Sequence, residues 1–469
     1  MMHGRGMRMP AFTLVMGGVG IVLYLIAHLI AIDYLFFAGY TVLQFVVLAT
    51  AWNILGGYCG YVNFGSAAFF AMGAYTSVAL HKLATSIDRF FDEGLIASAL
   101  HAVLPLPIPL LIVFGGLISG LVGLGTGYLT LRLRGAFFAI ATLALAVVLQ
   151  TLIVNWDFVG GSRGAYIIRP QTVPLIGNYI QYLFLIMLVL AVLALCVARA
   201  IERSQLGFGF ATIRDDEVAA EASGVPTLRL KLIATTVSGA LMGMAGAPFP
   251  YYIGYLEPAS AFGLAYAVNS IAMPMIGGTT SWIGPLVGAI LLGTLQQVAS
   301  VTISSAVNLL IVGLLLVAFV IIAPNGLVGL VQEFLRTAGP DRLTRRALGI
   351  LLVAGYGIVA GMFGVVFGLA AAMALAPAVG VFELVVSVLL IASAYGLLKL
   401  LSWGPLLATV SFALAIPLAL IHVWANQSLA SILMYGSLVV IAVAAIVLVQ
   451  SAGVKSLYRI PLRDRAATA

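Results

Sequence analysis

Residues 178–198, NYIQYLFLIMLVLAVLALCVA, form a run of 21 residues without a charged side chain. A run of about 20 apolar residues is long enough to cross the hydrocarbon core of a bilayer as one helix. The whole chain has the same character, because 63% of its 469 residues are apolar and 8% are charged. A water-soluble domain has about 25% charged residues. The composition therefore excludes a soluble fold.

The apolar runs are continuous, whereas the strands of an outer-membrane barrel alternate apolar and polar residues. The sequence therefore predicts an all-α polytopic membrane protein with a core of about ten helices and about four additional C-terminal transmembrane helices. Two of these helices, 65–81 and 262–276, are short and contain Gly or Pro, which is typical of the broken helices of transporters. The expected spans are 11–31, 35–57, 65–81, 107–130, 136–154, 178–198, 230–253, 262–276, 283–299, 306–323, 348–374, 382–400, 404–424 and 429–450.

Basic residues indicate the orientation of these spans, because Lys and Arg accumulate in cytoplasmic loops. With the N-terminus inside, the inside stretches are 58–64, 131–135, 199–229, 277–282, 324–347, 400–403 and the C-terminus. The most basic stretches of the chain all fall on this inside face. We therefore expect a multi-pass protein of the bacterial inner membrane with both termini in the cytoplasm. The net charge of +7 then needs no nucleic-acid partner.

A basic linker divides the expected spans into two groups. We expect a transmembrane core over 1–330, a linker over 331–347, a four-helix membrane extension over 348–452 and a basic cytoplasmic tail over 453–469. The extension has few polar side chains within its spans, and we interpret it as a structural or interaction element. Its intramembrane polar residues all lie near predicted span ends: Glu383, Lys399, His422 and Asn426.

The sequence indicates no catalytic or metal site. The five His and two Cys residues have no metal-ligand spacing, and neither a GxSxG nor a GxxxxGK[ST] motif is present. We expect neither an enzyme nor a cofactor, so any energy must come from an ion gradient or another polypeptide. Asp and Glu lie almost entirely in expected loops, which argues against an ion-coupled carrier. Backbone carbonyls can bind sodium, so that alternative stays open.

The inside segment 207–229, GFGFATIRDDEVAAEASGVPTLR, mixes acidic residues with alanines. It predicts a short amphipathic helix that ends at Gly224, with Pro226 just beyond. Such a helix is either a solvated surface element or a docking element for a cytoplasmic subunit.

Ordered blocks of residues 35–330 resemble the LivM-type permease subunits of branched-chain amino-acid ABC importers. A single block is weak support, whereas several in the same order and membrane positions are specific. The blocks are GYCGYVNFGSAAFFAMGAY at 57–75, LRLRGAFFAI at 131–140, NWDFVGGSRG at 155–164, IRDDEVAAEASG at 213–224, GGTTSWIGP at 277–285 and PNGL at 324–327.

The resemblance implies a transmembrane permease subunit that takes part in ATP-driven import of branched-chain or related amino acids. Its implied partners are a LivH-type second permease, two P-loop ATPases, a periplasmic solute-binding protein and membrane lipid. It also implies three sets of functional residues. These are Arg214, Asp215, Asp216, Glu217, Glu221 and Gly224 for coupling to an ATPase, Asn63, Ser66 and Asn269 for the translocation path, and Asn155, Trp156 and Arg163 in a loop facing the binding protein.

Three positions depart from the family pattern. Asn63 stands where the family often has Ser, Ser66 where it often has His, and Asn269 where an acidic residue is common. Such changes alter which polar groups of a solute can be matched, or they adjust helix packing alone. An importer of the same class for urea, short amides or aromatic and carboxylic acids therefore stays open. A stand-alone ion-coupled or facilitative carrier is a further alternative.

Overall fold

The computed structural model describes residues 8–30, 32–85, 104–130, 132–168, 172–173, 177–302, 313–314, 317, 323–338, 345–373, 377–425, 429–451, 454 and 458. The chain divides into two compact units, Met1–Gly293 and Thr294–Ala469. The predicted division at 330 and 347 stays a prediction. Most of the expected span 306–323 lies outside the described residues.

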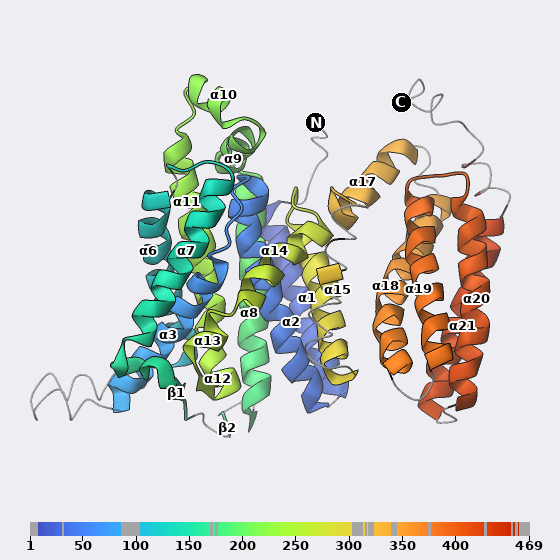
Figure 1. The fold of residues 1–469 in the computed structure, drawn as a ribbon, viewed down its shortest axis with the longest axis horizontal. Coiled ribbons are helices and arrows are strands. Elements are labelled where there is room, and N and C mark those ends of the chain that lie inside the picture. Colours follow the sequence, from blue (N-terminus) through green and yellow to red (C-terminus); the bar gives the residue numbers. More distant parts are fainter. Residues whose placement is uncertain are drawn as a thin grey trace, which may run out of the picture. The chain divides into compact units, whose positions relative to one another are not determined.

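Helices dominate the first unit (Figure 1). Its helices are α1 (Met9–Ile30), α2 (Asp33–Asn53), the π-helix η1 (Ile54–Tyr58), α3 (Ser66–Thr85), α6 (Ile108–Thr130), α7 (Ala136–Val154), α8 (Tyr179–Glu202), α9 (Gln205–Asp215), α10 (Glu217–Ala222), α11 (Thr227–Gly246), α12 (Phe249–Ile253), α13 (Pro258–Ala261), α14 (Leu264–Gly277) and α15 (Ile283–Thr302), the last continuing past Gly293. The 3-10 turns η2 (Asp157–Val159) and η3 (Gly161–Arg163) follow α7.

Eleven helices of the described residues are long and apolar enough to cross a membrane. Each corresponds to an expected span, which confirms the prediction of an all-α polytopic membrane protein. The expected spans 65–81 and 429–450 also form helices, α3 and α21 (Leu429–Gln450). Large side chains such as Leu14, Leu129 and Ile140 are exposed, as expected where helices face lipid.

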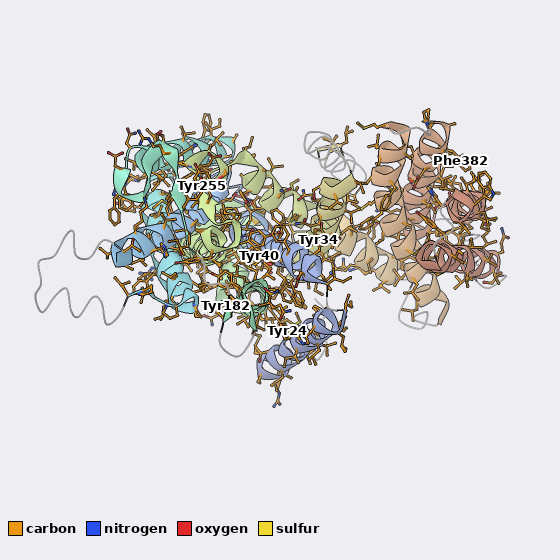
Figure 2. All side chains as sticks on the ribbon, turned by 90° about the horizontal axis from the view of Figure 1, so that it is seen from below. Tyr24, Tyr34, Tyr40, Tyr182, Tyr255 and Phe382 are labelled. Atoms are coloured by element: carbon orange, nitrogen blue, oxygen red, sulfur yellow. The ribbon has the colours of Figure 1, made fainter. Side chains whose placement is uncertain are left out.

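Small residues allow α3, α6 and α11 to pack closely. A Cβ atom at Gly73 of α3 would lie only 2.0 Å from the Gly243 carbonyl oxygen of α11. Membrane helices use such glycines because lipid provides little hydrophobic drive for association, so close backbone contact must stabilise the interface. Tyr40 of α2 is fully buried within the unit, whereas Tyr24 lies towards its outside on α1 (Figure 2).

The two ends of the first unit collect different loops (Figure 1). Contacts at one end join the loops after α2, α6, α8 and α14; we call it the α10 end. These are the loops that the basic residues predict on one common side. At the opposite end, β1 (Ala165–Tyr166) pairs antiparallel with β4 (Tyr255–Leu256), and β2 (Thr172–Val173) pairs with β3 (Gly177–Asn178); we call it the β1 end.

The second membrane helix is broken at the α10 end. The α-helical hydrogen-bonding of α2 changes to a π-helix over Ile54–Tyr58, and residues 59–65 are not helical before α3 begins at Ser66. A π-turn inside a helix frequently marks a functional site. The interruption coincides with the expected inside loop 58–64, next to the short span expected at 65–81, and it contains Gly60 and Gly65.

The second unit contains α17 (Gly326–Ala338), α18 (Arg345–Met373), α19 (Pro377–Leu398), α20 (Gly404–Ala425) and α21. Consecutive helices from α18 to α21 pack side by side. In α19 the helix begins five residues before the expected start at 382, because Pro377 fits the first helical position. Glu383 therefore lies six residues after the helix start, not one as the expected span places it, and its side chain is buried.

Candidate functional site

The α10 end contains two short helices, α9 and α10, that meet at Asp216. The Asp216 Oδ1 atom accepts hydrogen bonds from the backbone N–H groups of Val218 and Ala219, at 2.9 and 3.0 Å, and so caps α10. At the other end of α10, Gly224 has φ +82° and Val225 N–H donates to the Ala220 carbonyl. This αL ending satisfies carbonyls that the helix leaves unpaired. The helix thus ends at Ala222, two residues before the predicted end, and Gly224 takes the αL position that follows it.

The Glu217 side chain points from α10 into the protein. The Lys231 Nζ atom of α11 donates to Glu217 Oε1 at 2.7 Å, and the Tyr61 hydroxyl donates to the other carboxylate oxygen. The side chain of Lys231 is 3% exposed and that of Glu217 is 12% exposed. Lys231 Nζ also donates to the Tyr61 hydroxyl at 3.1 Å. The three side chains therefore form one network between α10, α11 and the break after α2.

The charge of Glu217 is stabilised by this network. Burial of the carboxyl raises its pKa, but the hydrogen bonds from Lys231 and Tyr61 and the charges of Lys231 and Arg134 outweigh burial and lower the pKa from its ordinary value. The pKa of Tyr61 is raised, first by burial and then by Glu217. Tyr61 therefore stays protonated and keeps its donor, while Glu217 stays ionised at neutral pH.

Arg134, in the loop between α6 and α7, holds both acidic residues of α10. Its Nη2 donates to Glu221 Oε2 at 3.0 Å, and its Nε lies 3.6 Å from Glu217 Oε1. Thr227 Oγ1, at the start of α11, donates to the other Glu221 oxygen at 2.8 Å. The charges of Glu217 and Glu221 raise the pKa of Arg134, so it remains a cation. These contacts attach α10 to α7 and α11.

Arg214 attaches α9 to the broken end of α2. Its Nη1 donates to the Gly57 carbonyl of the π-helix at 3.4 Å. Gly60, with φ +80°, passes close to the same side chain, and a Cβ there would lie 2.9 Å from Arg214 Cγ. Only glycine combines that backbone conformation with that approach.

An exposed surface remains on the outer side of α9 and α10. Phe208 and Val218 are each 61% exposed, and the Asp215 side chain is 74% exposed. Of the alanines, Ala219 and Ala222 are exposed and Ala220 is buried. Among the predicted coupling residues, Asp215 thus faces outward, whereas Glu217 faces the protein and Asp216 and Gly224 shape the ends of α10.

Glu202, at the end of α8, joins two further segments at the α10 end. Its Oε2 accepts from Trp282 N–H at 2.9 Å and from the Tyr58 hydroxyl at 3.4 Å. Close by, the Arg199 guanidinium lies 4.0 Å from the centre of the Phe12 ring. These contacts connect the π-helix, α8, α1 and the segment before α15.

The predicted path residues lie in and around the broken helix. Asn63 is buried; its Oδ1 accepts from Gly65 N–H at 2.7 Å, and its carbonyl accepts from Trp52 Nε1 at 2.9 Å. Ser66 Oγ lies 2.8 Å from Ser270 Oγ of α14 in a buried contact. Asn269, beside Ser270, is buried too. The structure therefore joins Ser66 to the helix that carries Asn269, although the two positions are 203 residues apart.

The third predicted set lies at the β1 end. Asn155 caps the end of α7, with its Nδ2 donating to the Thr151 carbonyl at 2.8 Å. Trp156 is exposed, and the Arg163 carbonyl accepts from the Tyr255 hydroxyl at 2.5 Å. The loop is thus fixed to β4 and presents aromatic side chains outward, among them Tyr166.

Sequence reasoning missed Lys231, Tyr61, Glu202 and Ser270 as site residues. Lys231 gave the clearest signal, since it is a charge within the expected span 230–253 and intramembrane charges are kept for specific partners. The other three lack a local signal, because their importance depends on partners far along the chain. The described residues contain no group of three His, Cys, Asp or Glu that could hold a metal ion.

The family model and the similar proteins indicate the same family. The model for the branched-chain amino acid transport system / permease component matches residues 33–320, more than half of the chain. The high-affinity branched-chain amino acid transport system permease protein LivM of Salmonella typhimurium is 27% identical over 317 residues, covering 62% of this chain and 69% of the relative. The LivM protein of Escherichia coli gives the same figures.

A more distant relative is a LivH-type permease. The probable branched-chain amino acid transport permease protein LivH of Methanocaldococcus jannaschii is 22% identical over 281 residues, covering 57% of this chain and 82% of the relative. No solved structure matches the chain significantly. The family match ends at 320, so α17 to α21 lie beyond it.

Proposed function

We propose that this chain, which belongs to the branched-chain amino acid transport system permease family, is the permease subunit of an ATP-driven importer. Its solutes are branched-chain or related amino acids. A LivH-type second permease completes the translocation path, two P-loop ATPases bind on the cytoplasmic side, and a periplasmic protein delivers the solute. The α10 end is the cytoplasmic end in this proposal, with both termini inside the cell.

The attachment of α10 to the membrane helices carries the proposal. The exposed side of α9 and α10, with Asp215 and Val218, is available to an ATPase, while the inner side of α10 is held by Lys231 and Arg134. Ion pairs that link rigid helices can transmit a displacement between two sites. Movement of an ATPase against α10 would therefore displace α11 and the start of α7 together.

The break after α2 places this movement beside the proposed path. Arg214 contacts Gly57 in the π-helix, and Tyr61, which binds Glu217, lies two residues before Asn63. Irregular backbone at membrane depth occurs where it is covered by protein or lines an aqueous cavity. In the proposed mechanism, the coupling helices change the conformation of this break, and Asn63, Ser66 and Asn269 meet the passing solute.

The β1 end is the proposed contact with the solute-binding protein. Its loop is attached through Arg163 to β4, so it is a fixed surface, and Trp156 is exposed on it. Exposed aromatic residues are enriched in protein interfaces. In the proposed cycle, the binding protein delivers the solute at the β1 end, and the ATPases then open the permease from the α10 end.

The decisive experiment is co-expression of the full chain with the two P-loop ATPases proposed as its partners, followed by purification of the complex. Val218→Asp introduces a charge on the exposed side of α10 and should abolish co-purification of the ATPases, because it places an unpaired charge in an interface. Ile168→Asp, at an apolar position of the β1 end that is 81% exposed against 61% for Val218, is the control and should retain them. Co-purification with Val218→Asp at the wild-type level would overturn the docking assignment.

Transport in proteoliposomes separates the importer from a stand-alone carrier. Leucine uptake should require the binding protein outside and ATP with the ATPases inside, and it should persist when ion gradients are collapsed. Uptake by the chain alone, lost on collapse of a gradient, would contradict the ATP-driven mechanism.

A further inference from the structure

The second unit contains a cavity of about 320 Å³ between α18, α19, α20 and α21. This volume is at the lower end of the roughly 300–1,000 Å³ of small-molecule sites. Most of the lining is aliphatic or aromatic, and the aromatic side chains come from three of the four helices. They are Tyr356, Phe363 and Phe367 of α18, Phe412 of α20 and Tyr435 of α21.

One polar pair lies in this apolar lining. Glu383 of α19 is 7% exposed, and its Oε2 lies 3.4 Å from His422 Nε2 of α20. Neither of these two atoms makes a hydrogen bond within the described part of the chain. The His422 ring stacks on Tyr435, with ring centres 4.9 Å apart. A buried carboxylate with an unsatisfied oxygen is costly in a membrane helix and indicates a functional site.

The pair lies towards one end of the cavity. Glu383 is six residues after the start of α19, about 9 Å along the helix axis, and His422 is three residues before the end of α20. The lining then continues deeper into the helices, to Tyr356 and Phe412, whose rings stack 6.1 Å apart. The site therefore has a polar end near the ends of the helices and an aromatic end further inside.

The chemistry of the polar end selects an ammonium group. An ionised Glu383 only accepts hydrogen bonds, and a neutral His422 can accept at Nε2. No Lys or Arg is among the described lining residues. A primary ammonium has three donors for these acceptors, and aromatic faces attract cations. We propose that the C-terminal extension binds a hydrophobic primary amine, with its ammonium group on Glu383 and His422 and its apolar part against Tyr356 and Phe412.

Binding of labelled octylammonium to the full chain in phosphatidylcholine nanodiscs tests this site, with empty nanodiscs subtracted. The expected result is saturable binding of one octylammonium per chain. Glu383→Gln keeps the shape of the side chain and removes its charge, and it should weaken binding at least about thirtyfold, the effect of removing one member of a buried charge pair. Octanol, which is neutral, should bind weakly and be little affected by this substitution.

Two further variants test whether binding requires the Glu383 carboxylate in particular and the open cavity. Glu333→Gln changes a carboxylate of the same unit that pairs with Lys399 outside the cavity, and it should bind octylammonium as the wild type does. Ala419→Phe fills the cavity and should remove binding of octylammonium while Glu383 remains. The thermal unfolding midpoint of each variant shows whether it is folded.

The lipid composition identifies the source of the ammonium group. Phosphatidylethanolamine carries a primary ammonium and phosphatidylcholine does not donate hydrogen bonds from its headgroup nitrogen. Loss of octylammonium binding in nanodiscs with phosphatidylethanolamine would assign the site to an aminolipid headgroup, and unchanged binding would assign it to a free amine. Preference for octanoate, absence of saturable binding, or full binding by folded Glu383→Gln would each overturn the proposal.

Discussion

Lys231 and Lys399 form ion pairs of similar length that differ greatly in exposure to solvent. Each ammonium pairs with a glutamate, Lys231 with Glu217 at 2.7 Å and Lys399 with Glu333 at 2.5 Å. The first pair is almost fully buried, whereas the second is 30% and 50% exposed. Exposed ion pairs contribute about 0–1 kcal/mol because water screens them. Removing one partner of a buried pair leaves an uncompensated charge and costs about 3–5 kcal/mol.

We therefore expect a strong double-mutant coupling for the first pair. Lys231→Met should lower the free energy of unfolding in mixed micelles, and adding Glu217→Gln should restore part of the loss, with a coupling of about 1–3 kcal/mol. The matched cycle, Lys399→Met with Glu333→Gln, should show a coupling below about 1 kcal/mol. Equal couplings in the two cycles would mean that burial does not distinguish these pairs.

The helix α10 has only six residues and depends on its contacts with the rest of the protein. Isolated helices of this length are unstable in water. Its inner contacts depend on an ionised Glu217, whose pKa the hydrogen bonds and charges of Lys231, Tyr61 and Arg134 hold below its ordinary value. A lowered pKa means that the carboxylate stabilises the docked helix above the pKa of the undocked group. That stabilisation is lost as the pH falls through the lowered pKa.

Amide hydrogen exchange over 217–225 should therefore be pH-dependent after correction for intrinsic rates. Protection should be constant through neutral pH and should decrease only in acid, below the ordinary titration range of a glutamate carboxyl, as Glu217 takes up its proton. Asp216 also caps α10, so Glu217→Gln is the required comparison. This variant should have lower protection at neutral pH and lack most of the acid step. An unchanged step in Glu217→Gln would assign it to another carboxyl group.

Local signals explain which parts of α10 the sequence predicts. The turn at Gly224 that follows the helix is predicted from one residue that tolerates φ above zero and a proline just beyond it. Apolar runs likewise predict the spans, and basic loops predict that Arg134 and Arg214 share one end. The network of Tyr61, Glu217 and Lys231 joins residues up to 170 positions apart, and hydropathy does not indicate which spans contact each other. For the same reason the contact of Ser66 with Ser270 could not be predicted.

In the whole molecule, the family match covers most of the first compact unit and the start of the second, and it ends before the four-helix group. The family match covers 33–320, and the four-helix group α18 to α21 follows it. Each unit has its own internal core, around Tyr40 in the first and Phe412 in the second. A unit with its own core can fold independently. The proposed ATPase surface and the proposed amine site therefore lie on units that can be removed or altered separately.

Two deletions should consequently have opposite effects. A chain ending at residue 338 should retain the two ATPases on co-purification and lose octylammonium binding, because it keeps α9 and α10 and lacks the cavity helices. A full-length chain with 207–224 replaced by a Gly/Ser linker should lose the ATPases and bind octylammonium normally. If the truncated chain lost the ATPases as well and its unfolding midpoint were lowered, the extension would instead be required for the stability of the first unit. Loss of apolar burial on removing the extension would then be the physical cause.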